Sequence, residues 1–258
     1  MVYHPRSYDD SYAYALPSDG VEINYSVANA KYAAFYVPGI HPIPKRLWVA
    51  FCGNGSLALD WMTILREYPP NGDAFLLIDY PGYGRNGGYA TIAATRASFN
   101  AALKVLTERL QTDEDRLTLC AIGHSLGAAV ALDFATNHRV QKVVLIAPFT
   151  TLREEAATFF GGWIARMLIE SYDNRANLSE VYKRNPDARV AIFHGTNDEV
   201  IPVRMGRELA HAFPSIEFSA VENADHVSVL NHAHDDIINW MNGASGPSDK
   251  NGSEPDRP

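Results

Sequence analysis

Ser125 stands at the centre of a short segment whose residue types suit nucleophilic catalysis. The segment reads GHSLG (123–127), follows the apolar run LTLCAI (117–122) and precedes a helical pattern at 126–137. A G-x-S-x-G segment between a strand and a helix is typical of a serine held in a strained turn, where small glycines let neighbouring backbone approach. The N-terminus of the following helix favours developing negative charge. We therefore predict that Ser125 is a nucleophile that attacks an acyl carbon.

A serine hydroxyl becomes an effective nucleophile when an imidazole takes its proton and a carboxylate holds that imidazole. His226 follows the apolar run IEFSAV (216–221), and Asp198 follows the run RVAIFH (189–194). Both residues are therefore expected on loops just after strands. The order Ser125, Asp198, His226 along the chain predicts a catalytic triad in which His226 is the base and Asp198 orients it.

Two other carboxylates compete with Asp198 for this role. Asp225 immediately precedes His226, and Glu199 immediately follows Asp198. A residue adjacent to a histidine does not easily reach Nδ1 of its neighbour, so Asp225 is the less favoured acid. Glu199 is also a weaker competitor than Asp198.

An acyl-transfer site also needs two backbone donors for the oxygen that becomes negatively charged in the transition state. The position of Leu126, directly after the serine, predicts that its N–H is one donor. The loop GNGS (53–56) follows the apolar run 47–52, and its glycines allow a close turn. We expect Asn54 N–H to be the second donor, with Gly55 N–H as the alternative; the glycines would otherwise only make a tight turn.

Two patterns that could bind a cofactor or metal carry little weight. The segment GYGRNG (82–87) matches G-x-G-x-x-G, but a dinucleotide-binding helix begins inside that motif. Here Pro81 leads a long turn, and the helical pattern begins near Ala90. His232 and His234 are two residues apart in a helical pattern, so they point to different faces. We expect no cofactor and no metal.

Short apolar runs alternate with helical patterns along most of the chain. Continuous apolar runs are typical of parallel strands covered on both faces. Their alternation with helices predicts a doubly wound, mostly parallel sheet with functional residues at the carboxyl ends of the strands. The first forty residues are expected to add antiparallel strands at one edge. The expected strands are 33–37, 47–52, 74–79, 117–122, 142–147, 189–194 and 216–221, and the expected helices are 57–67, 90–110, 126–137, 203–213 and 227–242.

The stretch 148–188 interrupts this alternation. Its apolar residues recur at helical spacing behind a capping-box pattern, which fits either a short helical lid or an ordinary helix packed on the sheet. As a lid it would leave the pocket open to small or medium acyl chains. Phe159, Phe160 and Trp163 would then be the candidate substrate contacts.

Bulk properties favour one enzyme-sized domain. The chain has 258 residues, 47% of them hydrophobic, which suits a single domain over 1–242 followed by a disordered tail over 243–258. A formal net charge of −8 offers no attraction for nucleic acid or anionic lipid. No apolar run approaches the roughly 20 residues that span a bilayer, and no secretion signal is visible. We expect a cytoplasmic protein without membrane insertion, in which Cys52 and Cys120 are buried thiols.

Six segments together resemble a known family. They are FCGNGSLALDW, DYPGYGRNGG, GHSLGAAVAL, APFTTL, HGTNDEVIP and NADHVSVL, and they resemble the α/β-hydrolase superfamily, within it the BEM46-like, ABHD13-like serine hydrolases. The resemblance implies an α/β-hydrolase fold with a mostly parallel eight-stranded sheet, and a triad of Ser125, Asp198 and His226. One departure is that Cys52 and Gly53 stand where many relatives have His-Gly.

The sequence thus predicts a serine hydrolase of the carboxylesterase type that uses water to cleave a small or medium acyl substrate without a cofactor. A thioesterase or a peptidase would use the same residues. A non-catalytic binding protein of the same fold is the alternative from another class, although such proteins usually lose a triad member. A dinucleotide-dependent oxidoreductase is the weakest alternative, and the oligomeric state is left open.

Overall fold

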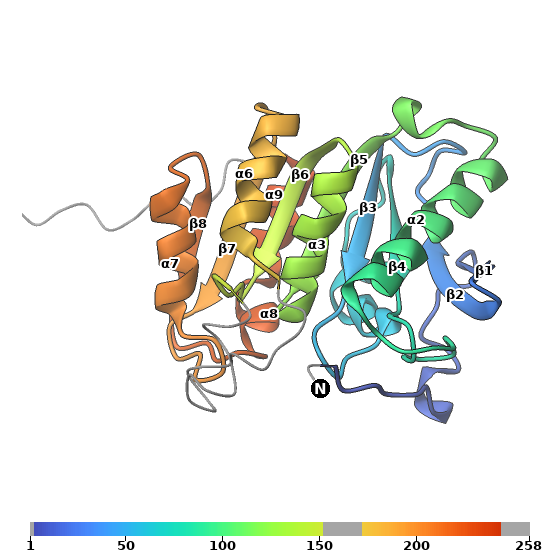
Figure 1. The fold of residues 1–258 in the computed structure, drawn as a ribbon, viewed down its shortest axis with the longest axis horizontal. Helices are drawn as coiled ribbons and strands as arrows, with labels where there is room; N and C mark the ends of the chain where they lie inside the picture. The colour runs from blue at the N-terminus through green and yellow to red at the C-terminus, as the bar shows by residue number, and fades with distance from the viewer. Residues whose placement is uncertain (1–2, 152–171, 244–258) are drawn as a thin grey trace, which may run out of the picture.

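A twisted eight-stranded sheet forms the centre of the molecule (Figure 1). The computed structural model describes residues 3–151 and 172–243. The strand order is β1-β2-β4-β3-β5-β6-β7-β8; the pairs β1–β2 and β2–β4 are antiparallel, and all other pairs are parallel. The strands are β1 Val21–Val27, β2 Ala30–Val37, β3 Arg46–Phe51, β4 Asp73–Ile78, β5 Thr118–His124, β6 Val140–Ile146, β7 Arg189–Gly195 and β8 Glu217–Val221.

Helices cover both faces of the sheet. On one face α2, α3, α6 and α7 contact one another in succession, whereas α9 packs on β6 from the other face (Figure 1). The short α1 lies beside α9, where His234 Nε2 donates to the carbonyl oxygen of Ile64 at 3.3 Å. The α-helices are α1 Met62–Leu65, α2 Ile92–Arg109, α3 Leu126–Asn137, α6 Asn174–Arg184, α7 Val203–Ala212, α8 Val229–His232 and α9 His234–Asn242. The 3-10 turns are η1 Asp10–Tyr12, η2 Ala58–Trp61 and η3 Glu114–Arg116.

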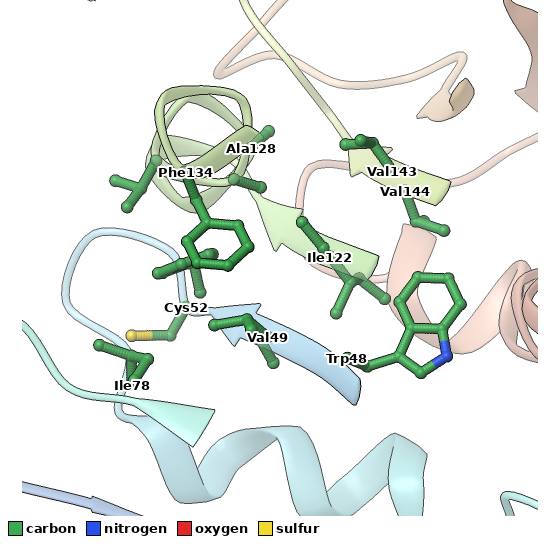
Figure 2. Close-up of a cluster of buried hydrophobic side chains, with 14 of the residues drawn as sticks. Trp48, Val49, Cys52, Ile78, Ile122, Ala128, Phe134, Val143 and Val144 are labelled. Atoms are coloured by element: carbon green, nitrogen blue, oxygen red, sulfur yellow. The ribbon is translucent and has the colours of Figure 1, made fainter. Parts of the chain in front are cut away.

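Burial on both faces explains why the central strands are apolar throughout. Trp48 and Val49 in β3 and Ile122 in β5 are fully buried. Figure 2 shows them in one cluster with Phe134 of α3 and Val144 of β6. Such a core requires large apolar side chains at consecutive positions, because both faces of each parallel strand meet a helix layer. The mostly parallel sheet that the alternation of strands and helices predicted is therefore confirmed.

Local capping fixes where the longer helices begin and end. Thr91 caps α2 by accepting a hydrogen bond from Ala94 N, and Asp173 caps α6 by accepting one from Ala176 N. Gly243 ends α9 in the left-handed conformation, with φ 102°. These residues satisfy backbone groups that a helix leaves without internal partners.

The N-terminal strands form a hairpin at one edge of the sheet, as expected for the first forty residues. Its turn places Ala28 at φ 47° and Asn29 at φ 67°, the pair of positive values that a two-residue hairpin turn of type I′ requires. β2 then pairs with β4, so the hairpin extends the parallel sheet by two antiparallel strands.

The stretch predicted as a lid is only partly described. Its last part forms α6, which packs beside α3 on the helix layer. Phe159, Phe160 and Trp163 lie outside the described residues, as does 244–258 of the expected tail. The lid, its substrate contacts, the division at 242/243 and the disordered tail therefore stay predictions.

Both cysteines are free and buried, as predicted. Cys120 lies in β5 opposite Trp48 of the neighbouring β3, and Cys52 follows the end of β3. Burial raises the pKa of Cys120 to about 12 and raises the pKa of Cys52 as well. The thiols are therefore protonated, and Figure 2 shows the sulfur of Cys52 beside Ile78 in the apolar core. Within the two described ranges, no helix has the length and apolar character needed to cross a membrane.

Candidate active site

Ser125 occupies a sharp turn between β5 and α3. Its backbone is in a strained conformation, with φ 56° and ψ −119°, a region that non-glycine residues rarely adopt. Ser125 N donates to the carbonyl oxygen of Ile146 at 2.8 Å, and the carbonyl oxygen of Ser125 accepts from Ala128 N at 3.0 Å. The turn is held by strands and helix on both sides, so it presents the serine at the carboxyl edge of the sheet.

The two glycines of GHSLG are required by close backbone contacts. A Cβ on Gly123 would lie 2.0 Å from the carbonyl oxygen of Gly127, and a Cβ on Gly127 would lie 2.0 Å from that of Phe51. These distances mean that the start of α3 packs directly against its own strand and against the end of β3. Because Phe51 pairs with Gly123 in the sheet, the loop that follows β3 lies beside the Ser125 turn.

His226 and Asp198 form a continuous hydrogen-bonded chain with Ser125. Ser125 Oγ lies 3.0 Å from His226 Nε2, and His226 Nδ1 lies 2.8 Å from Asp198 Oδ2. The side chain of Asp198 is completely buried, whereas that of His226 is 13% exposed. An imidazole between a hydroxyl and a carboxylate can accept the hydroxyl proton while the carboxylate stabilises the resulting positive charge.

The loop after β7 holds the carboxylate of Asp198 in a fixed orientation. Asp198 Oδ1 accepts hydrogen bonds from Val200 N at 2.9 Å and Ile201 N at 2.7 Å. Burial by itself would raise the pKa of Asp198, but hydrogen bonds from His194 and His226 and from the Ile201 backbone outweigh it. The pKa of Asp198 is thus held well below its usual range, and the group stays ionised beside the imidazole.

The competing acids do not contact the imidazole of His226 in this arrangement. Asp225 is exposed and its Oδ1 accepts from Val227 N at 2.9 Å and Ser228 N at 2.7 Å, so it caps the turn into α8. Glu199 is exposed on the Asp198 loop. Of the three carboxylates considered in the sequence, the structure brings Asp198 against His226.

The expected oxyanion donors lie on adjoining segments. Leu126 is the first residue of α3, directly after the serine, and Asn54 and Gly55 lie on the loop that leaves β3 beside it. Gly55 has φ 78°, a left-handed value that favours glycine. The two predicted donor segments therefore meet at the carboxyl edge of β3 and β5, next to Ser125.

Two histidines support the site in ways that the motif alone did not reveal. His124 is buried and its Nε2 donates to the carbonyl oxygen of His226 at 2.8 Å, which links the serine turn to the histidine loop. Burial, together with neighbouring His226, lowers the pKa of His124 to about 4. His194 is the last residue but one of β7 and contacts the Asp198 loop. The signal for both was only their proximity in sequence to Ser125 and Asp198.

The glycines of the segment 82–87 pack against the chain itself. A Cβ on Gly84 would lie 2.5 Å from Asp79 Oδ2. Asn86 Nδ2 donates to the carbonyl oxygen of Asp79, and Asn86 Oδ1 accepts from Ala33 N. Internal packing therefore explains this segment. Within the described ranges, no cluster of three or more His, Cys, Asp or Glu side chains could hold a metal ion.

The fold defines the class of protein as an α/β hydrolase, and comparison with solved structures supports this class. The esterase Pf2001 of Pyrococcus furiosus has a similar structure, with a TM-score of 0.67 over 94% of this chain and 97% of that one, at 18% sequence identity. The esterase domain of a Rhodothermus marinus protein gives a TM-score of 0.62 over 86% of this chain and 98% of that one, at 16% identity. The predicted α/β-hydrolase fold is thereby confirmed.

Sequence comparison places the chain in a family. The family model described as serine aminopeptidase, S33, matches residues 44–189, more than half of the chain, and the protein belongs to this hydrolase family. An uncharacterised protein of Mycobacterium tuberculosis is 32% identical over 143 residues, 55% of this chain and 48% of that protein. Protein bem46 of Schizosaccharomyces pombe is 26% identical over 131 residues, 49% of this chain and 42% of that protein. The chain thus spans about half the length of these curated relatives that it matches, and the resemblance to α/β hydrolases is confirmed.

Proposed function

We propose that this α/β hydrolase is a serine esterase that cleaves an ester-like acyl bond of a small or medium substrate. The observation that carries the proposal is the hydrogen-bonded chain from Ser125 Oγ to His226 Nε2, at 3.0 Å, and from His226 Nδ1 to Asp198 Oδ2, at 2.8 Å. Its placement on a strained strand-to-helix turn supports the same reading, because such a turn exposes the nucleophile at the edge of the sheet.

Each step moves one proton and exchanges one bond. His226 Nε2 takes the proton of Ser125 while Oγ forms a bond to the acyl carbon. The N–H groups of Leu126 and Asn54 stabilise the oxyanion. The carbon–oxygen bond to the leaving group then breaks, and the imidazolium, stabilised by ionised Asp198, gives its proton to the leaving alkoxide. Water repeats the sequence on the acyl-enzyme: His226 takes its proton, the acid is released and Ser125 regains its hydrogen.

The first test is labelling with a fluorophosphonate probe, read by peptide mass spectrometry. Labelling of Ser125 in the native chain, and its absence in Ser125→Ala, would establish an activated serine. The fold of the variant is checked by thermal unfolding; Ser125 is only partly buried, so loss of its hydroxyl should cost little stability. A folded native protein that resists labelling would contradict the proposal and favour a non-catalytic binding protein of the same fold.

Peptide amide hydrolysis is the second candidate, favoured by the description of the family as serine aminopeptidases. A panel that pairs p-nitrophenyl esters of graded chain length with aminoacyl p-nitroanilides separates the two activities. Faster turnover of the anilides than of the esters would assign the same triad to an aminopeptidase. Thioesters belong in the panel because a thioesterase uses the same nucleophile.

A further inference from the structure

Residues 3–12, which we call the N-terminal arm, run along the loops at the carboxyl edge of the sheet. The arm is the dark blue segment that passes beneath the end of β3 in Figure 1. Its backbone is anchored at two points. His4 N donates to Asn54 Oδ1 at 2.7 Å, and Gly84 N donates to the carbonyl oxygen of Arg6 at 2.7 Å. The arm therefore touches the loop that follows β3, which we call the oxyanion loop (residues 53–60).

A buried carboxylate connects the arm to this loop. Tyr8 Oη donates to Asp79 Oδ2 at 2.6 Å, and Asp79 Oδ1 accepts from Ala58 N at 2.8 Å. Asp79 is 1% exposed, so water cannot replace these partners. Burial raises the pKa of Asp79 to about 6, although the bonds from Tyr8 and Ala58 act in the opposite direction. The hydroxyl of Tyr8 is thus one of few groups that stabilise this carboxylate.

A second tyrosine of the arm, Tyr12, binds a second aspartate in the same way. Tyr12 Oη donates to Asp60 Oδ1 at 2.6 Å, and Asp60 Oδ2 accepts from Leu57 N at 2.8 Å. In both pairs, one carboxylate oxygen binds a tyrosine of the arm and the other binds a backbone N–H of the loop. The two carboxylates therefore link the arm to two consecutive residues of the loop, Leu57 and Ala58.

The side chain of Asn54 closes the other end of the loop. Its Oδ1 accepts from His4 N and also from Tyr83 Oη, at 2.8 Å. These bonds orient the residue whose main-chain N–H is the proposed oxyanion donor. Preorganised donors stabilise a transition state better than donors that must reorient during the reaction. The loop is thus tied at Asn54, Leu57 and Ala58.

We propose that Tyr8 and Tyr12 are positioning residues that fix the oxyanion loop for catalysis. This inference rests on the proposed esterase function, because it concerns the second oxyanion donor of that site. Neither tyrosine touches the reacting atoms; each acts on the backbone of the loop through an aspartate, and Tyr8 Oη also accepts from Leu59 N at 3.4 Å. Loss of the hydroxyls should therefore reduce the stabilisation of the transition state more than it reduces the affinity for the substrate.

The structure provides a matched control at the opposite edge of the sheet. Tyr68 Oη donates to Asp73 Oδ2 at 2.5 Å, and Asp73 begins β4, whereas Asp79 follows the end of the same strand. Tyr68→Phe therefore removes the same kind of tyrosine–aspartate bond far from the oxyanion loop. Tyr8→Phe, Tyr12→Phe and Tyr68→Phe all keep the ring and delete one hydroxyl.

The test compares p-nitrophenyl butyrate hydrolysis and amide hydrogen exchange in these variants and in the Tyr8→Phe/Tyr12→Phe double variant. We expect kcat of the double variant to fall about 10-fold, less than the ~10²-fold or greater loss on removing an oxyanion donor, with KM nearly unchanged. The amides of residues 54–58 should exchange faster. Tyr68→Phe should leave both readouts at the native level. Asn54→Ala, which keeps the main-chain N–H, should lower kcat in the same way.

Two results would overturn the proposal. If the double variant and Tyr68→Phe lose comparable thermal stability but both keep native kcat, the arm only stabilises the fold. Unchanged exchange of amides 54–58 would likewise show that the tyrosines do not fix the loop. Hydrogen exchange needs no turnover, so it reports on the arm even if fluorophosphonate labelling shows that the proposed function is wrong.

Discussion

Nε2 of His194 lies 3.4 Å from Oδ2 of Asp198, and both side chains are fully buried. The same nitrogen lies 2.8 Å from the carbonyl oxygen of Ile201, so it donates to the carbonyl oxygen and also faces the carboxylate. One imidazole thus holds the acid and the loop that carries it. The position of this imidazole can therefore influence how the carboxylate supports His226.

We expect His194→Leu to lower kcat for ester hydrolysis about 10-fold or more, because the carboxylate loses a neighbouring N–H and the loop loses its anchor at Ile201. His194→Gln can place an amide N–H near the position of Nε2 and should retain most of the activity. Steady-state kinetics on p-nitrophenyl butyrate compares the two variants. Equal losses in both would show that the imidazole acts only by filling space.

The choice of acid can be tested with a pair of isosteric changes. Asp198→Asn should lower kcat by about 10⁴-fold, because the amide no longer stabilises the imidazolium and favours the wrong tautomer of His226. Asp225→Asn should keep kcat within a factor of about 2, because the Asp225 side chain binds backbone N–H groups and is exposed, and such surface changes have small effects. Circular dichroism confirms that both variants are folded. The opposite order of losses would assign the role to Asp225.

Gly127 should tolerate no side chain, although it lies in a helix where alanine is intrinsically favoured. A Cβ would lie 2.0 Å from the carbonyl oxygen of Phe51 and 2.6 Å from that of Cys52, and backbone in two strands cannot move aside cheaply. We expect Gly127→Ala to lower the free energy of unfolding by about 3 kcal/mol or more. Urea denaturation measures the loss.

Gly87→Ala is the matched control for this prediction. Its Cβ would meet neighbours only at 3.6 Å, from Ala30 Cβ and the carbonyl oxygen of Lys31, an ordinary van der Waals distance. The free energy of unfolding should change by less than about 1 kcal/mol. If Gly127→Ala were equally well tolerated, the close packing of α3 on the end of β3 would be wrong.

His124 should make the fold sensitive to mild acid. Its folded pKa of about 4 lies below the unfolded value of 6.5 because burial, and then His226, disfavour the charged form. Below pH 6.5 the unfolded chain therefore binds the proton more readily, and stability falls as the pH falls towards 4, by up to about 3 kcal/mol. His124→Gln, which can keep a donor to the carbonyl oxygen of His226, should lose less stability between pH 7 and pH 5.

Asp79 acts with the opposite sign in the same range. Its folded pKa of about 6 lies above the usual aspartate value of 3.8, so protonation below pH 6 favours the folded state. The pH dependence of the native protein alone therefore mixes two effects. Subtracting the His124→Gln curve from the native curve, both from thermal unfolding at each pH, isolates the histidine. A difference that is flat from pH 7 to pH 5 would contradict the assignment.

The strands, the helices and the fold class could be predicted from the sequence because all of them depend on local patterns. The apolar runs at 47–52 and 117–122 have to lie between two helix layers, and β3 and β5 occupy nearly these positions. The GHSLG segment could be read in the same way, since a strand before it and a helix after it are visible in the chain. The triad was predicted in the same way, because Asp198 and His226 each follow an apolar run, and the family resemblance implied the same three residues.

Tertiary structure alone decided which groups meet. The sequence contains Asp198, Glu199 and Asp225 as possible acids, and only the placement of the β7 loop beside the β8 loop brings Asp198 within 2.8 Å of His226. The contacts of the N-terminal arm likewise join residues about 50 to 70 positions apart, such as Tyr8 with Asp79. A hydrophobic period fixes which face of an element is buried, but hydrogen bonds between distant loops arise only after the sheet has set their separation, so no local pattern encodes them.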